Sequence, residues 1–391
     1  MRTACTQDAR ARDDIFGRVT VLLCPDKFKG SLGATEACAA LARGLRRARP
    51  DLDVLSHPMA DGGDGSLAVL RAHLPLVERR VATTDPLGRP LTAAYLVDER
   101  SGEAYVELSA ASGLALLAAG ERDPARASTL GTGALLADAV ARGHRRITLL
   151  LGGSATHDVA LGIAHALGAR FLDRGGRELA PRGESLARVA RVDLAGVSTG
   201  ARAADFRVLV DVSNPLCGPS GAAASFARQK GADGAAVARL ADGTRRFADR
   251  LAEVAGARVD ELPGGGAAGG VAAGMAALFG ASVEGGFGFL AAATGLAARV
   301  AAADAVVTGE GRLDATSLRG KVVGGVAALC ARADVPLHAV AGAVALSEGA
   351  RASLRLASAW AVLDEAGSVA EAMRGAAGYL EGIGVRLGGR L

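Results

Sequence analysis

The chain has 391 residues, of which 50% are hydrophobic but only 3% aromatic, and its formal net charge is +4. Single hydrophobic cores rarely span a chain of this length, so two domains are expected. The arginines are spread along the whole chain, without a basic stripe or interleaved aromatic residues, which argues against a nucleic-acid partner.

The cysteines and the apolar stretches indicate where in the cell the protein is expected. Five scattered cysteines without a CxxC pair are typical of a reducing compartment, so a cytoplasmic location is expected. Residues 1–18 lack the apolar core of a secretory signal and are expected to form a loose tail. The uncharged stretch from Leu262 to Val283 contains Pro263 and many glycines, so it predicts a buried loop and helix and no membrane partner.

The opening of the chain predicts a βαβ unit. A short apolar strand at 19–23 is followed by Pro25, which ends sheet pairing, and by a helix at 34–48 with apolar residues at helical spacing. A second strand begins at 54–55 and leads into Asp61-Gly-Gly-Asp-Gly-Ser66. Loops at the carboxyl ends of strands line the binding crevice in open α/β sheets, so functional residues are expected there.

The middle of the chain departs from this alternation of strand and helix. After a helix at 67–74, antiparallel strands with turns at 85–88 and 101–102 indicate an inserted second domain. A helix at 131–143, a strand at 147–151, the loop 152–158 and a helix to Leu167 follow. Strand, glycine loop and helix start form a plausible anion cradle, although a simple turn is the alternative in a chain with 54 glycines.

Two further loops of the middle region contain unusual residues. A strand at 206–210 ends at Asp211 and is followed by a turn with Asn214, the only asparagine of the chain, and by Gln-Lys230-Gly. The stretch 263–270 is so rich in glycine that it predicts either a close backbone approach or a flexible hinge.

From Ala303 the alternation of strand and helix returns. A strand at 305–308, a loop at 309–314, a helix at 322–332 and strands at 337–340 and 360–363 are expected. We expect the later strands to join the first two in one parallel sheet, which gives an α/β fold with a discontinuous domain.

Lysine is rare, because almost every basic position is arginine. A compact ammonium suits a phosphate or a transferred phosphoryl group, so the surviving lysines are candidates for function. They are Lys27, Lys29, Lys230 and Lys321. The chain contains no HExxH, GxSxG or P-loop motif, which leaves glycine loops, lysines and carboxylates that suit phosphate and Mg²⁺ binding.

Several stretches together resemble, in the same order, the motifs of the bacterial glycerate kinase family. They are PDKFKGSLGA, ADGGDGS, LGGSATHD, DVSNPLCGP, QKGA, PGGGAAGG and TGEGRLD followed by RGK. The resemblance implies ATP and Mg²⁺ as cofactors, D-glycerate as substrate, and a flavodoxin-like parallel-sheet domain interrupted by a second, inserted α/β domain. The chain departs from the common family pattern at Asp64, Ser66, His157, Val159 and Thr316.

The expected domains are a discontinuous flavodoxin-like domain at 19–66 plus 285–391 and an inserted α/β domain at 67–284. The expected reaction transfers the γ-phosphoryl group of ATP to a hydroxyl of D-glycerate, giving 2-phosphoglycerate rather than 3-phosphoglycerate. The alternatives are a kinase of another small hydroxy acid and a non-catalytic nucleotide- or metabolite-binding protein. A dinucleotide-dependent oxidoreductase is disfavoured because no GxGxxG follows the first strand. We expect a monomer or homodimer.

The candidate site residues fall into four groups. The expected catalytic residues, with one aspartate orienting the hydroxyl and one lysine balancing charge, are Asp211 or Asp61 and Lys230 or Lys321. The expected substrate-binding residues are Asp26, Lys27, Lys29, Ser31, Gly62, Gly63, Asp64 and Asn214. The expected ATP-binding residues are Gly152, Gly153, Ser154, Thr156, Gly264, Gly265 and Gly266. The expected Mg²⁺ ligands are Asp158, Glu310 and Asp314.

Overall fold

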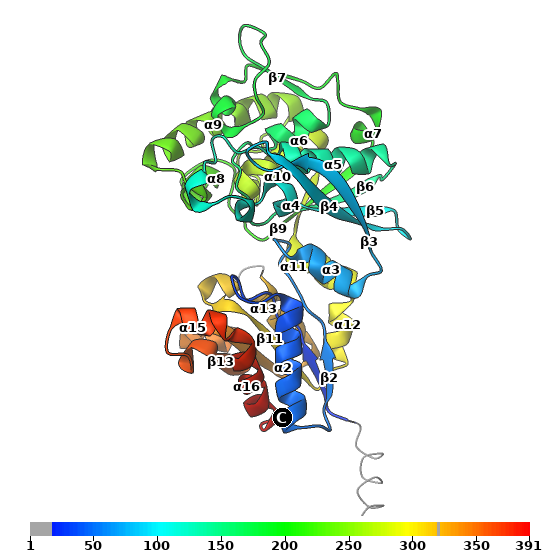
Figure 1. Cartoon of the computed structure of the whole chain (residues 1–391), viewed down its shortest axis with the longest axis vertical. Helices are drawn as coiled ribbons and strands as arrows, with labels where there is room; N and C mark the ends of the chain where they lie inside the picture. Colours follow the sequence, from blue (N-terminus) through cyan, green and yellow to red (C-terminus); the bar gives the residue numbers. More distant parts are fainter. Residues whose placement is uncertain (1–17, 319–320) are drawn as a thin grey trace, which may run out of the picture. The chain divides into compact units, whose positions relative to one another are not determined.

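The structure is a computed structural model that describes residues 18–318 and 321–391. The chain divides into two compact units (Figure 1), with boundaries at residues 60/61 and 289/290. The first unit combines the two ends of the chain, and the second unit contains residues 61–289. Except for Arg18, the tail expected at 1–18 lies outside the described residues.

The first unit is built on a five-stranded parallel sheet. Its strands are β1 (Thr20–Leu23), β2 (Asp53–Ser56), β11 (Ala305–Leu313), β12 (Leu337–Val344) and β13 (Leu356–Ala361). They are arranged in the order β13-β12-β11-β1-β2, and each neighbouring pair is parallel. This is the 2-1-3-4-5 order of flavodoxin-like sheets. The expectation that the late strands join the first two in one parallel sheet is confirmed.

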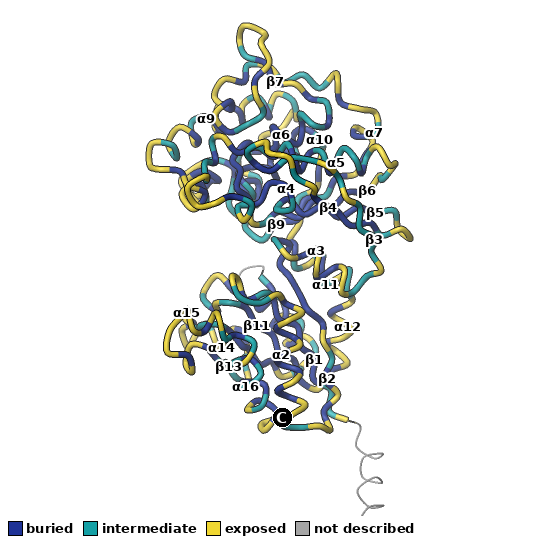
Figure 2. Tube along the Cα trace, in the orientation of Figure 1, coloured by how far each residue is buried: buried dark blue, intermediate teal, exposed yellow. Residues whose placement is uncertain are grey.

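Helices pack against this sheet and against each other. They are α2 (Ala34–Ala48), α12 (Leu296–Ala301), α13 (Val322–Ala333), α14 (Glu348–Ser353), α15 (Val369–Arg374) and α16 (Ala376–Gly388), with short 3₁₀ turns η5 (Ala315–Leu318) and η6 (Val362–Asp364). Helix α2 has the range that its apolar spacing predicts, and Figure 2 shows the alternation of buried and exposed residues along it. Gly44 of α2 packs directly on α16, because a Cβ at Gly44 would lie 2.1 Å from the carbonyl oxygen of Glu381.

Two sequence-based boundaries in this unit were wrong. The expected loop at 309–314 is strand as far as Leu313, where β11 still pairs with β12. Its glycines allow close strand pairing, since a Cβ at Gly309 would lie 2.0 Å from the carbonyl oxygen of Val340. The strand expected at 360–363 is instead β13, which ends at Ala361, and the chain then turns in η6.

The second unit contains a mixed six-stranded sheet in the order β10-β9-β6-β5-β4-β3. Its strands are β3 (Val77–Thr84), β4 (Pro90–Asp98), β5 (Glu103–Glu107), β6 (Arg146–Leu150), β9 (Asp205–Val210) and β10 (Ser282–Gly285). The strands β3, β4 and β5 are antiparallel, as predicted, and β5, β6, β9 and β10 are parallel to one another. A separate antiparallel pair is formed by β7 (Arg170–Leu172) and β8 (Arg191–Asp193).

The helices of the second unit vary in length from one turn to 22 residues. They are α3 (Ser66–His73), α4 (Ser109–Ser112), α5 (Leu130–Ala141), α6 (Leu161–Ala166), α7 (Thr199–Arg202), α8 (Ala222–Phe226), α9 (Gly234–Ala255), α10 (Ala267–Phe279) and α11 (Gly286–Thr294), the last of which contains the second unit boundary; the 3₁₀ turns are η1 (Leu114–Leu116), η2 (Ala119–Glu121), η3 (Gly183–Arg188) and η4 (Arg228–Lys230). In the described part of the chain, no helix combines the length and apolar character that a membrane crossing requires.

Candidate functional site

The acidic loop, residues Asp61–Ser66, connects to the first turn of α3. One carboxylate oxygen of Asp61 accepts a hydrogen bond from the backbone N–H of Gly63 at 3.1 Å. Gly62 has φ of +95°, and a Cβ there would lie 2.6 Å from the Cα of Gly286. Only glycine fits this tight turn without strain, so the loop presents Asp61 and Asp64 in a defined conformation.

The glycine loop, residues Gly152–Asp158, follows strand β6 and packs on the acidic loop. A Cβ at Gly152 would lie 2.3 Å from the backbone nitrogen of Asp64, and one at Gly153 would lie 3.4 Å from the Cβ of Asp64. Gly153 also has a left-handed backbone conformation, with φ of +60°. The two predicted motif loops are therefore in direct backbone contact, although nearly ninety positions separate them in the sequence.

Lys230 joins the glycine loop from the turn η4 and is buried, with 2% of its surface exposed. Its Nζ donates to the hydroxyl of Ser154 at 2.6 Å and to the carbonyl oxygen of Thr156 at 2.7 Å. Burial lowers the pKa of Lys230 to about 7, although the nearby charge of Asp158 opposes this shift. The structure thus brings the predicted lysine together with two of the predicted phosphate-binding residues.

Asp158 and His157 complete the glycine loop as fully buried residues. Asp158 Oδ2 accepts hydrogen bonds from the backbone N–H and the hydroxyl of Thr129, both at 2.8 Å. Burial raises the pKa of Asp158 to about 6. His157 Nε2 is 2.8 Å from the Thr244 hydroxyl, and burial lowers the pKa of His157 to about 3. The departure from the family pattern at position 157 is therefore accommodated by a buried hydrogen bond.

The glycine-rich stretch 264–270 packs closely on two other predicted loops. The Gly266 N–H donates to the carbonyl oxygen of Asn214 at 2.9 Å. A Cβ at Gly266 would lie 2.4 Å from the Pro215 carbonyl oxygen, and one at Gly269 would lie 2.2 Å from that of Thr156. Gly264 has φ of +78°, and a Cβ at Gly265 would lie 2.9 Å from the Leu262 carbonyl oxygen and 3.4 Å from the Cβ of Ala273. Close backbone approach accounts for these glycines.

Asp211 and Asn214 follow strand β9 at the same end of the sheet. Asp211 is partly exposed at the end of the strand. The side-chain amide of Asn214 donates to the Ser220 carbonyl oxygen at 2.7 Å and to the Ser225 hydroxyl at 3.1 Å. These bonds fix the turn after β9, which supports a role of Asn214 in shaping the loop.

The remaining candidates belong to the first unit and lie at the carboxyl ends of β1 and β11. The Asp26 N–H donates to the carbonyl oxygen of Gly309 at 2.8 Å, and Asp26 Oδ1 accepts from the N–H of Lys27. The strand order reverses between β1 and β11, the position at which open α/β sheets bind ligands. Asp26 and Glu310, both mostly buried, flank this point.

Other first-unit candidates have defined local roles. The Ser31 hydroxyl donates to the Met373 carbonyl oxygen at 2.7 Å, and Lys29 is exposed. Asp314 Oδ1 accepts from the N–H and the hydroxyl of Thr316, and these hydrogen bonds lower the pKa of Asp314. Lys321 precedes α13 as its N-terminal flanking residue.

Glu107 was not predicted, although it contacts the acidic loop. It is the last residue of β5, and its carboxylate accepts hydrogen bonds from the N–H groups of Gly65 and Leu67. The sequence does contain a signal, because Glu107 is a carboxylate at the end of a predicted strand. That signal identifies a position at the sheet edge but not its partners.

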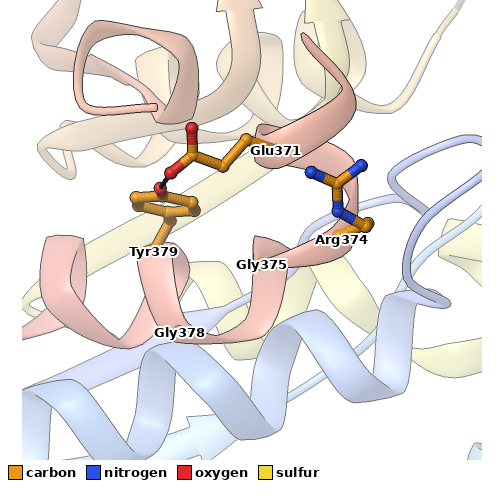
Figure 3. Close-up of a pocket in the computed structure, with 5 residues that line it drawn as sticks. All are labelled: Glu371, Arg374, Gly375, Gly378 and Tyr379. Atoms are coloured by element: carbon orange, nitrogen blue, oxygen red, sulfur yellow. Dashed lines mark hydrogen bonds between the residues drawn. The ribbon is translucent and has the colours of Figure 1, made fainter. Parts of the chain in front are cut away.

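Among the described residues no side chains form a metal cluster, and the surface hollow of the first unit is not lined by candidate residues. In the described ranges 18–318 and 321–391, no three His, Cys, Asp or Glu side chains are grouped as metal ligands. A surface hollow of about 500 Å³ in the first unit (Figure 3) is lined by Glu371, Arg374, Gly375, Gly378 and Tyr379. The Tyr379 hydroxyl donates to Glu371 at 2.7 Å there, and none of the candidate residues lines this hollow.

Comparisons with known proteins identify relatives along most of the chain. The family model described as "Glycerate kinase family" matches residues 21–389. The chain is 35% identical to glycerate 2-kinase of Escherichia coli strain K12 over 356 residues, which cover 91% of this chain and 93% of that protein. It is also 35% identical to glycerate kinase of Bacillus subtilis strain 168, covering 92% and 94% of the two chains. A crystal structure assigned as glycerate kinase 2 from Salmonella typhimurium LT2 superposes with a TM-score of 0.80 and 34% identity, covering 96% of this chain and 98% of that one.

Proposed function

The chain belongs to the glycerate kinase family, and from this premise we propose that it transfers the γ-phosphoryl group of ATP to a hydroxyl of D-glycerate. The proposed product is 2-phosphoglycerate, as the name of the Escherichia coli relative suggests. The relatives cover most of the length of this chain, which supports carrying the whole reaction over.

The observation that carries the proposal is the buried Lys230 ammonium in the glycine loop. Because Lys230 donates to Ser154 Oγ, the hydrogen of that hydroxyl is directed away from the lysine and can be donated to a phosphate oxygen. The ammonium also supplies positive charge in surroundings of low dielectric, where it stabilises an anion more strongly than in water. The glycine loop is thus suited to the phosphates of ATP.

In this proposal, carboxylates act on the phosphoryl acceptor, D-glycerate. Asp61 or Asp211 orients or deprotonates the glycerate hydroxyl, while Asp26, Lys27 and Lys29 provide further polar contacts. Phosphoryl transfer depends mainly on positioning and on charge stabilisation, so one carboxylate near the hydroxyl is sufficient. The close fit of the acidic loop against the glycine loop supports a role for Asp61 near the phosphates.

Mg²⁺ is proposed as the partner of ATP, because it neutralises phosphate charge when bound. Mg²⁺ usually binds to proteins through only one or two carboxylates and keeps several waters. Glu310 and Asp314 at the end of β11 fit this requirement better than Asp158, whose side chain is fully enclosed by protein. The role of Asp158 as a Mg²⁺ ligand stays a prediction, and its hydrogen bonds to Thr129 favour a structural role.

A coupled assay of ADP release with ATP, Mg²⁺ and D-glycerate tests the proposal. Adding enolase alone detects 2-phosphoglycerate directly, whereas 3-phosphoglycerate would also need a mutase. Turnover with another small hydroxy acid but not D-glycerate would support the altered-substrate alternative. Tight ATP binding without turnover on any acid would indicate a non-catalytic binding protein.

A further inference from the structure

Glu107 anchors the acidic loop to the central part of the second unit's sheet. Its Oε1 accepts hydrogen bonds from the Gly65 N–H and the Ser109 hydroxyl, both at 2.7 Å, and its Oε2 accepts from the Leu67 N–H at 3.2 Å. The residue is 9% exposed. All three donors are neutral groups, so the buried carboxylate is stabilised by hydrogen bonds rather than by an ion pair.

Two of these donors belong to the start of α3, directly after Asp64. The first N–H groups of a helix have no partner within the helix and carry partial positive charge. Here the carboxylate of Glu107 occupies two of them, the N–H groups of Gly65 and Leu67. These two donors at the start of α3 are therefore not open to a phosphate, which favours the glycine loop as the anion-binding element of the pair.

The acidic loop contacts both Glu107 and the glycine loop. A Cβ at Gly153 would lie 3.5 Å from the carboxyl carbon of Asp64 and 3.6 Å from the Cβ of Ser109, the residue that donates to Glu107. A shift of the acidic loop away from Glu107 would therefore displace Asp64 relative to the proposed phosphate site. Burial raises the pKa of Glu107, and its three hydrogen bonds oppose part of this rise.

We propose that Glu107 is a positioning residue for the proposed phosphoryl transfer. It fixes the conformation of the acidic loop, so that Asp61 and Asp64 meet the acceptor in one orientation next to the glycine loop. Glu107 itself does not contact substrate; it acts through the backbone of Gly65 and Leu67. This inference rests on the proposed function, because it assigns the acidic loop to the acceptor.

The test compares Glu107→Gln with Glu103→Gln, the same change at the other end of β5. Glu103 accepts from Thr148 at 2.6 Å and from Arg207 at 3.2 Å, two partners that lie outside the acidic and glycine loops. In Glu107→Gln the side-chain NH₂ group faces a backbone N–H group. Two donors cannot form a hydrogen bond, so part of the contact between residue 107 and the acidic loop is lost. Steady-state kinetics with both substrates and hydrogen exchange of the 61–67 amides are measured.

We expect Glu107→Gln to lower kcat/KM for D-glycerate roughly 10–100-fold, the scale of a lost hydrogen bond to a charged group. The KM for ATP should stay within about twofold of wild type, since only the acidic loop moves. The amides of Gly65 and Leu67 should exchange faster, and Glu103→Gln should change none of these quantities.

Normal kinetics in Glu107→Gln would overturn the proposal, as would equal losses for both substrates accompanied by a lower melting temperature. Unchanged exchange at Gly65 and Leu67 would also overturn it. A wild-type chain that does not phosphorylate D-glycerate would overturn the proposed function instead, and the exchange measurement would still decide whether Glu107 anchors the loop.

Discussion

The Nζ of Lys230 lies 2.6 Å from the hydroxyl of Ser154, and both groups are buried in the second unit. An ammonium in such a position is costly to bury and is retained by hydrogen bonds to the loop it supports. This pair links a short turn before α9 to the loop after β6.

Replacing Lys230 by methionine should lower kcat/KM for ATP roughly 10²–10³-fold, the scale of losing one preorganised donor at a developing charge. The melting temperature should fall little or rise, because methionine is similar in length and removes a buried charge. Arg228→Met, on the exposed side of the same turn, is the control. Activity of Lys230→Met close to wild type would contradict the proposed phosphate role.

The stability of the protein should depend on pH through Lys230. Its pKa is about 7 in the folded chain and about 10.5 in the unfolded chain, so between these values the unfolded state binds more protons. The contribution of Lys230 to the free energy of unfolding therefore rises with pH across this window, by at most about 1.4 kcal/mol per pH unit. Chemical denaturation from pH 7 to pH 10 should show this rise in wild type relative to Lys230→Met. Parallel curves for the two proteins would refute it.

One of the two aspartates is expected to act on the glycerate hydroxyl. Asp61→Asn or Asp211→Asn should lower kcat by roughly 10²–10⁴-fold, the usual effect of a lost general base, with the affinity for ATP nearly unchanged. Asp205→Asn, at the exposed start of β9, is the control for Asp211. If both variants turn over at the wild-type rate, neither aspartate is the base.

Gly152 should not tolerate a side chain. A Cβ there would lie 2.3 Å from the Asp64 nitrogen, so Gly152→Ala must push the acidic and glycine loops apart. Overpacking of this kind typically costs about 1–3 kcal/mol, and activity should fall with it. Gly120→Ala, where no atom lies within 4 Å of the added Cβ, should leave stability and activity unchanged. A fully active Gly152→Ala would show that the contact between the loops is dispensable.

Thr156→Val separates a structural role of this hydroxyl from a role in binding. The Oγ1 of Thr156 is buried and makes no hydrogen bond in the structure, so the isosteric valine should not lower the melting temperature. If the hydroxyl donates to a phosphate of bound ATP, the KM for ATP should rise roughly 10-fold. An unchanged KM would remove Thr156 from the nucleotide site.

The sequence predicts the local features of this fold better than it predicts the contacts between distant residues. The range of α2 follows from apolar spacing that its burial confirms. The end of β11 was missed because Gly309 is typical of loops, whereas here it permits close pairing with β12. The bond between Lys230 and Ser154 spans 76 positions, so no local pattern could indicate it.

In the candidate site, too, local features are predicted better than long-range contacts. The motif loops themselves were recognised as stretches, and the structure shows which of them meet in the second unit. Glu107 was missed because its importance lies in backbone donors 40 and 42 positions away. A carboxylate at a strand end has the same appearance in sequence whether it is solvated or bound in this way.

The pairing of β1 with β11 has a consequence for how the chain acquires its structure. Val21 pairs with Ala305, and the Thr308 hydroxyl donates to the Cys24 carbonyl oxygen across 284 positions. Contacts between such distant segments form slowly, because a long loop must close first. During synthesis β1 and β2 emerge well before β11, so they wait without their central neighbour while residues 61–289 can already fold. We therefore expect the nascent N-terminal segment to need protection from aggregation until the last third of the chain is made.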